Sequence, residues 1–524
     1  MKRYLSCLLF LGIMLPLCAD DRNDSCHTEI TSRSYLSVNP VDSANPVFKS
    51  AFRNNLAHMR EDGWHGAMQL VLFGGKSNKS EDTARYFLPF GKEELLVTER
   101  SSVLGGITPD LFAEHFGIFT ADFDFESTIA IRPKQSVIGV GFEGRFSFWR
   151  NECRGSGLFL DVITSVQHVK NRLNLTENVV EGRSTEVNPD LVDLAPPAVT
   201  NMIAAFKQEA WKFGKIDDEA DDMTRTGLAD IEVKLGYEWL QHEPCHLETY
   251  LGILIPTGNA PKSEHLFEAI VGHGKHCGVL FGNNMGVEIW SNECGSSLRM
   301  ETSTMSKYLF KKKQVRSIDL KYKPWSRYIS MYASEEDARA AATLGGILGQ
   351  NNFTPGINLL TREVDVRPGF MHTMNTALVY QSRGFMGELG YNLYARRSEC
   401  LKLSDPFPET AAIKDPLGIG QTRPIRDITG NILLEASELT STRGNLPVAL
   451  ADYQLSVLTE NDLDLVSAST PAALAHTVYG AIGYQWESCD YPMFIDFGGS
   501  YNFSTSNNSV LDRWMLWGKF GISL

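Results

Sequence analysis

The sequence predicts an all-β protein folded as a closed antiparallel β-barrel of about 12 strands, and three observations support this prediction. Segments of roughly ten residues alternate apolar residues with polar residues or glycine, which is typical of strands with one apolar face. Short turns alternate with long connections along the chain. The number of predicted strands is even, so the chain enters and leaves the barrel at the same end.

The composition narrows the class of function. The 524 residues contain 49 Lys and Arg against 63 Asp and Glu, a net charge of −14, which argues against a surface for nucleic-acid phosphates. Beyond a short apolar stretch at the start, no run approaches the roughly 20 apolar residues of a transmembrane helix. Any membrane-spanning segments are therefore expected to be strands.

The first residues are predicted to be an export signal. Lys2 and Arg3 precede an apolar stretch at 4–17, and Leu17-Cys18-Ala19 is an acceptable cleavage site. We expect residues 1–19 to be a signal peptide. A lipoprotein modified at Cys18 is disfavoured because Leu17, the residue before it, is not small.

Two regions follow the signal peptide. Residues 20–63 are polar and are interrupted by Asn39-Pro40 and Asn45-Pro46, so they are expected to form a periplasmic arm or a plug rather than a domain. Residues 64–524 carry the alternating pattern and are predicted to form the barrel.

The alternation is clearest at 135–149. There Ile138, Val140 and Phe142 share one face, and Glu143 and Arg145 share the other. Full charges on the second face are not tolerated unpaired in a dry core.

The same pattern recurs along the chain. It is present at 229–239 and in the last segment, which ends at Leu524. Nine further segments bring the count to twelve: 65–74, 157–169, 247–256, 278–290, 297–306, 371–381, 385–396, 476–486 and 492–503. A barrel of fourteen strands is the alternative, if 125–132 and 355–366 also span, and a secreted water-soluble β-sandwich is the alternative fold.

The connections are of two kinds. Short turns lie at 151–153, 242–245, 292–294, 381–383 and 487–489, and the intervening links are mostly long, at 75–134, 170–228, 257–277, 307–370, 397–475 and 504–510. This asymmetry is that of membrane barrels with short periplasmic turns and long extracellular loops.

The long loops are expected to be partly helical. Apolar residues recur at helical spacing between Val199 and Phe213, and helix starts are predicted at Thr108-Pro109-Asp110 and at Ser334 with Asp337.

Four tryptophans precede short turns, where an interfacial aromatic girdle is expected: Trp149, Trp239, Trp290 and Trp486. Strict alternation puts Trp290 on the polar face, which leaves a position in the lumen open as the alternative for at least one of the four.

In this pattern, residues 64–524 resemble the Gram-negative outer-membrane β-barrel class. The strand end Ile253-Leu254-Ile255-Pro256-Thr257-Gly258 is similar to the Pro-Thr-Gly strand end of FadL-like and phenol-pathway transporter barrels. The chain ends in Leu524, whereas members of the class usually end in an aromatic residue. The resemblance implies an exported channel or transporter in the outer membrane, with membrane lipid, the barrel assembly machinery and small solutes as partners.

The inward face of a twelve-strand barrel is where function is expected, because such a lumen is intermediate between a filled barrel and an open channel. Fifteen charged residues are predicted to line it: Glu143, Arg145, Asp161, Asp230, Glu232, Lys234, Glu238, Glu248, Glu288, Arg299, Glu301, Glu388, Arg396, Asp496 and Lys519. Ten acids against five bases predict a narrow, cation-preferring channel for small cationic or neutral solutes.

Two alternatives to a channel remain open. If the inward charges form a closed salt-bridge network, the protein is a non-conducting surface or structural protein. The second alternative is an envelope enzyme, which is disfavoured because the sequence has no Gly-x-Ser-x-Gly motif and no identifiable catalytic constellation.

The cysteines are interpreted as disulfide candidates clustered at the short-turn rim. Removing Cys7 and Cys18 from nine cysteines leaves seven, an odd number. The candidates are Cys26, Cys153, Cys245, Cys294 and Cys489, with pairing left open. His273, His276 and Cys277, and separately His242, Cys245 and His246, are metal-ligand types, but each group lacks a third or fourth convincing ligand, so no metal and no cofactor are predicted.

Overall fold

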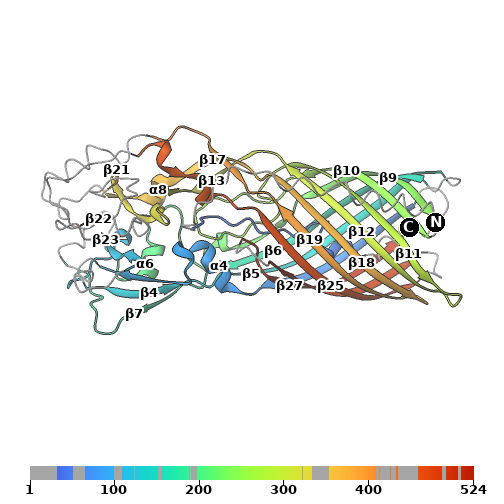
Figure 1. Ribbon diagram of the computed structural model, residues 1–524, viewed down its shortest axis with the longest axis horizontal. Helices are drawn as coiled ribbons and strands as arrows, with labels where there is room; N and C mark the ends of the chain where they lie inside the picture. The colour runs from blue at the N-terminus through green and yellow to red at the C-terminus, as the bar shows by residue number, and fades with distance from the viewer. Residues whose placement is uncertain are drawn as a thin grey trace.

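Twelve strands of the described residues form one closed antiparallel barrel in the computed structural model (Figure 1). The structure describes residues 32–50, 65–99, 109–122, 124–151, 156–187, 189, 198–242, 244–321, 323–332, 353–408, 412–413, 425–426, 432–434, 458–486, 491–504 and 509–524. The predicted signal peptide lies outside these residues.

Each barrel strand pairs with its neighbours in the sequence, and β1 pairs with β27 to close the barrel. The strands are β1 (His65–Ser77), β5 (Lys134–Asn151), β6 (Ser156–Arg172), β9 (Ile231–His242), β10 (Cys245–Ile255), β11 (Gly278–Ser291), β12 (Ser296–Leu309), β18 (Phe370–Ser382), β19 (Phe385–Arg396), β25 (Ala473–Trp486), β26 (Met493–Phe503) and β27 (Arg513–Ser523). The prediction of twelve strands is confirmed. Because the β5–β6 and β1–β27 pairings close the twelve described strands into a ring, the β-sandwich alternative is wrong.

The fourteen-strand alternative is also wrong. Within 125–132, β4 (Glu126–Ala130) pairs with β2 (Glu94–Thr98) and β7 (Thr176–Val179), outside the barrel. Within 355–366, the chain forms α8 (Gly356–Leu360) and the start of β17 (Thr361–Arg367). Strand β17 pairs with β13 (Lys312–Ser317) and β20 (Cys400–Leu403), so both segments belong to the long connections.

The wall of the barrel is apolar outside and polar inside. Ile138 and Leu389 are 62% and 69% exposed, whereas Glu143 and Arg145 on the same wall are buried. Large apolar side chains that face outward have no protein to pack against, which is the arrangement of a barrel surrounded by lipid.

The four tryptophans before short turns all point outward. Trp290 is 47% exposed, because β11 gains an extra residue between Glu288 and Trp290 relative to β12. This bulge reverses the alternation. The alternative that Trp290 faces the lumen is therefore wrong, and Trp149, after a similar shift in β5, is also exposed.

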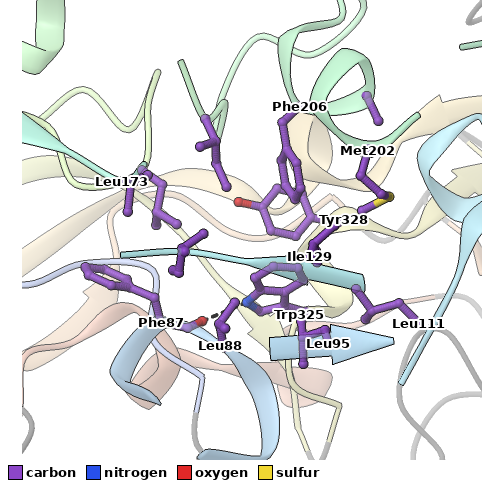
Figure 2. Packing of buried hydrophobic residues seen from close by; sticks show 14 of the residues in the cluster. Phe87, Leu88, Leu95, Leu111, Ile129, Leu173, Met202, Phe206, Trp325 and Tyr328 are labelled. Atoms are coloured by element: carbon purple, nitrogen blue, oxygen red, sulfur yellow. Dashed lines mark hydrogen bonds between the residues drawn. The ribbon is translucent and has the colours of Figure 1, made fainter. Parts of the chain in front are cut away.

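The described residues of the long connections, here called the loop unit, share a core rich in aromatic residues at one end of the barrel (Figures 1 and 2). The rings of Trp211 and Tyr328 stack with centroids 5.0 Å apart, and Trp325 Nε1 donates to the Phe87 carbonyl at 2.8 Å. We call this end of the barrel the loop end and the opposite one, where the chain makes short turns, the turn end.

The helices of the loop unit are shorter than predicted. Only Met202–Lys207 (α6) is helical within 199–213, because the chain then turns so that Trp211 packs on Tyr328. At the predicted start after Pro109, Leu111–Phe112 forms β3 and Ala113–Phe116 a 3₁₀ turn. The predicted start at Ser334 lies outside the described residues. No helix in the described ranges is long and apolar enough to cross a membrane.

Candidate functional site in the barrel lumen

Residues 32–50, here called the lumen segment, run through the inside of the barrel. At the loop end, Ser34 N donates to the Ser467 carbonyl at 2.9 Å. Midway, Asn375 Nδ2 donates to the Ala44 carbonyl at 2.9 Å. At the turn end, Ser50 Oγ donates to Asp496 Oδ2 at 3.0 Å. The segment therefore spans the lumen from one end to the other.

The turn-end half of the segment is a short helix, α2 (Pro46–Lys49), whose N-cap Asn45 accepts from Val47 N at 3.1 Å. Phe48 is buried against Phe73 of β1, with ring centroids 6.5 Å apart. A Cβ at Gly141 of β5 would overlap the Phe48 ring, so a glycine on the inward face makes room for the segment.

One group of wall charges surrounds Arg145. Its guanidinium donates to Asp161 Oδ1 at 2.8 Å and to Glu248 Oε2 at 2.7 Å, and lies 4.0 Å from the centre of the Phe159 ring. All three charged side chains are almost fully buried. Two bidentate ion pairs on one guanidinium satisfy both carboxylates, which is the geometry that a buried charge requires.

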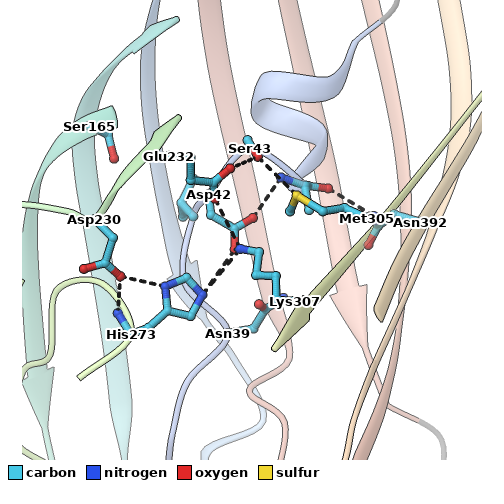
Figure 3. A network of polar contacts seen from close by, with 12 residues as sticks. Asn39, Asp42, Ser43, Ser165, Asp230, Glu232, His273, Met305, Lys307 and Asn392 are labelled. Atoms are coloured by element: carbon cyan, nitrogen blue, oxygen red, sulfur yellow. Dashed lines mark hydrogen bonds and ion pairs between the residues drawn. The ribbon is translucent and has the colours of Figure 1, made fainter. Parts of the chain in front are cut away.

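A second group joins the wall to the lumen segment (Figure 3). Lys307 Nζ contacts Asp42 of the segment and lies 3.3 Å from Glu232 Oε1, and Lys234 Nζ lies 3.0 Å from Glu232 Oε2. Ser43 of the segment donates to Glu232. The segment is thus attached to β9 and β12 through charged hydrogen bonds.

His273, in the connection after β10, completes this group. Its Nδ1 lies 2.7 Å from Asp230 Oδ2 and its Nε2 lies 3.6 Å from Asp42 Oδ2. Burial and the nearby Lys307 lower the pKa of His273, but the hydrogen bonds to Asp230 and Asp42 outweigh them, so the pKa is raised above its ordinary value. Burial raises the pKa of Asp42, but Lys307 and His273 outweigh it and hold the pKa below its usual range.

Several other charges of the wall are engaged in smaller groups. Glu143 accepts from Gln69, Lys519 Nζ lies 3.9 Å from Asp496 Oδ2, and Glu301 lies 3.2 Å from both His246 Nε2 and Arg299 Nε. Of the fifteen predicted lumen residues, thirteen are buried, and Glu288 and Arg299 are half-buried.

The ion pairs bear on the predicted preference for cations, because they give partners to acids that the prediction treats as unpaired. The prediction assumed acids without partners, but Asp161, Glu232 and Glu248 each pair with a base, and Asp230 with His273. Three titratable residues of the group around Glu232 were not among the predicted lumen residues: Lys307, Asp42 and His273. Lys307 lies one residue beyond the predicted strand end on the inward face, so a strand extended by one residue would have included it.

The cysteine prediction is only partly within the described residues. Cys245 begins β10 and is half-buried, and Cys294 is an exposed free thiol in the turn between β11 and β12. Cys26, Cys153 and Cys489 lie outside the described residues, so the pairing stays a prediction.

Among the described residues, one group brings three metal-binding side chains together: Asp222, Glu264 and His265. Lys262 Nζ lies 3.5 Å from Asp222 and 3.6 Å from Glu264, so its ammonium competes with a cation for both carboxylates. His276 Nδ1 bonds to the Phe310 carbonyl at 2.9 Å, and its Nε2 lies 3.1 Å from Gln314 Nε2, so both ring nitrogens contact protein groups.

No protein-family model matches this chain, and no curated protein matches it. Among solved structures, it is similar to an outer-membrane channel from Pseudomonas putida F1, at 6% identity and a TM-score of 0.36, over 89% of this chain and 98% of that one. It is also similar to the transport unit of the autotransporter AIDA-I from Escherichia coli, at 7% identity and a TM-score of 0.32, over 92% and 94% of the two chains.

A Pseudomonas aeruginosa FadL homologue matches at 9% identity and a TM-score of 0.27, over 94% of this chain and 97% of that one. At sequence identities and TM-scores this low, none of the three similarities carries an argument about function. The chain's own architecture, a closed antiparallel barrel of twelve described strands with an apolar outer surface and a charged interior, is that of an outer-membrane β-barrel.

Proposed function

We propose that this protein is an outer-membrane channel for small solutes, closed by the lumen segment. The observation that carries the proposal is the way the lumen is filled. Its wall side chains leave room for a separate stretch of chain, and this stretch is attached by hydrogen bonds and ion pairs in addition to the apolar packing of Val41, Val47 and Phe48. Such contacts exchange with water more readily than a dry apolar core does.

The cavities of the described residues support this proposal. Four of them, of about 40, 20, 20 and 10 Å³, are each bordered on one side by the lumen segment and on the other by the barrel wall. The boundary between segment and wall is therefore less well packed than a protein core. A solute path opens along this boundary when the segment moves.

The proposed orientation follows from the two ends of the barrel. The short turns face the periplasm and the loop unit faces the outside, with lipid around the apolar band. Export by the N-terminal signal and insertion by the barrel assembly machinery are part of the same proposal.

The preferred charge of the solute is inferred from the charged side chains that line the lumen once the lumen segment is removed. Removal of the lumen segment takes Asp42 away from Lys307 and leaves ten predicted wall acids against five predicted bases and Lys307. An opened pore is therefore expected to prefer cations. In a variant without residues 32–50, Asp230→Asn with Glu232→Gln should lower the cation-to-anion permeability ratio, and the outward Ile231→Leu should not.

A non-conducting surface protein is the second candidate, and the paired wall charges favour it. Liposome swelling in small sugars separates the two. The channel proposal expects slow swelling with the full chain and fast swelling with the variant that lacks residues 32–50. If a folded deletion variant is as impermeable as protein-free liposomes, the non-conducting function replaces the channel.

A further inference from the structure

The largest of the four cavities lies at the loop end of the lumen, between the lumen segment and the surrounding wall. Its border includes Tyr35 to Val41 of the segment, Arg316 of β13 and Arg513 at the start of β27. Its volume is about 40 Å³, which at roughly 10–15 Å³ for each water corresponds to about three water molecules or one small oxyanion group.

Arg316 is buried in this border with unsatisfied donors. Its side chain is 1% exposed, and its guanidinium lies 3.1 Å from the centre of the Tyr35 ring. Nη2 donates to Gln314 Oε1 and lies 3.8 Å from Glu399 Oε1, beyond hydrogen-bond distance. Nε and Nη1 have no acceptor. Two nitrogen atoms of a buried guanidinium are thus without hydrogen-bond acceptors.

Arg513 also borders the cavity and also has an unsatisfied donor. It is 4% exposed, and its Nη2 donates to the Asn39 carbonyl of the lumen segment at 3.2 Å. Its Nε has no acceptor, and within the described residues no ion pair joins it to a carboxylate. Asp42, the acid of the nearby segment, already contacts Lys307.

The two acids on the border are held by backbone groups. Glu399 accepts from Thr470 N at 2.8 Å, and Glu268 accepts from Lys262 N at 2.7 Å and from His265 N at 3.2 Å. Glu399 Oε1 forms an ion pair with Arg316 Nη2 at 3.8 Å, but neither acid accepts a hydrogen bond from Arg316 Nε or Nη1 or from Arg513 Nε. A buried guanidinium without an acceptor is costly, and a planar oxyanion satisfies it with two parallel hydrogen bonds.

We propose that this cavity binds a small oxyanion, a carboxylate or a phosphate group, between Arg316 and Arg513. Both arginines also contact the lumen segment, through the Tyr35 ring and the Asn39 carbonyl. A bound anion therefore holds the segment between the loop unit and the wall, and stabilises the closed lumen. The site is a property of the closed protein and does not depend on conduction.

Binding is measured by isothermal titration calorimetry on the full chain in detergent, at constant ionic strength. Inorganic phosphate and acetate are titrated separately, so that a phosphate site and a carboxylate site are distinguished. We expect at least one of them to bind, and Arg316→Gln and Arg513→Gln each to weaken its affinity about tenfold or more. Arg367→Gln, on an exposed arginine of β17, should bind as the original chain does.

Far-UV circular dichroism checks that each variant is folded. Arg316→Lys keeps the charge but removes the paired donors, so it should weaken binding less than Arg316→Gln does, and it serves if the Gln variant does not fold. The proposal is overturned if neither anion binds the full chain, or if the variants at Arg316 and Arg513 bind as tightly as Arg367→Gln.

Discussion

The core of the loop unit and the interior of the barrel are both buried, but different kinds of contact stabilise each of them. The loop unit packs Phe116, Phe206, Trp211, Trp325 and Tyr328 ring against ring, with centroid distances from 5.0 to 6.1 Å. Figure 2 shows three of these residues, Phe206, Trp325 and Tyr328. The lumen instead pairs charges such as Lys307 and Glu232 across the lumen segment (Figure 3). Close aromatic packing resists rearrangement, whereas polar contacts exchange with water. Movement is therefore expected in the lumen segment and not in the loop unit.

The largest effect is expected in the aromatic core. Trp325→Ala removes a fully buried indole and the hydrogen bond to Phe87, which should cost the loop unit about 3–5 kcal/mol. Hydrogen exchange should show faster opening of the loop unit while the barrel strands stay protected. Val466→Ala, at a 59% exposed position, is the control and should change little. Equal loss of protection in the barrel strands would contradict the separation of the two regions.

A smaller effect is expected at the attachment of the lumen segment. Lys307→Met leaves Asp42 and Glu232 without their shared ammonium, although Lys234 still pairs with Glu232. We expect the segment to open about 3 kcal/mol more easily, measured by hydrogen exchange of the amides at 41–47. Lys311→Met removes only an exposed pair with Asp365, so it should cost less than about 1 kcal/mol. Unchanged protection in Lys307→Met would mean that apolar contacts such as Phe48 alone hold the segment.

Much of the barrel could be predicted because the wall has one rule, apolar outside and polar inside, that every strand repeats. The exceptions are informative. Strict alternation places Trp290 on the wrong face, because a one-residue bulge between Glu288 and Trp290 leaves no mark in the sequence pattern. Asp42 was not recognised as a lumen residue because its partners, Lys307 and His273, lie more than 200 residues away and only closure of the barrel brings them together.

The loop unit was least accessible to prediction. Its strands are short and pair across distant connections, as β13 does with β17, and local patterns do not report such pairs. The helix predicted between Val199 and Phe213 is shortened because Trp211 packs on Tyr328, a tertiary contact that outweighs helical periodicity.

The smallest expected effect is a pH dependence of the lumen segment. Burial and Lys307 lower the pKa of His273, but Asp230 and Asp42 outweigh them and raise it in the folded protein. The stability that protonated His273 gives to the closed lumen segment is therefore fully present below the unfolded pKa of about 6.5. This stability is lost as the pH rises through the folded pKa of His273. Protection factors of the amides at 41–47 should therefore fall towards alkaline pH. His273→Gln should remove this fall and His168→Gln should keep it; a fall of the same size in His273→Gln would assign it to another group.

The central claim is that the lumen segment closes the barrel, and single-channel recording in planar bilayers tests it most directly. Three proteins are compared at the same salt and voltage: the full chain, Lys307→Met and the variant lacking residues 32–50. The account predicts rare openings for the full chain, more frequent openings of the same conductance for Lys307→Met, and a steadily open pore for the deletion. A folded deletion variant that shows no current steps, or a full chain that conducts as steadily as the deletion, would contradict it.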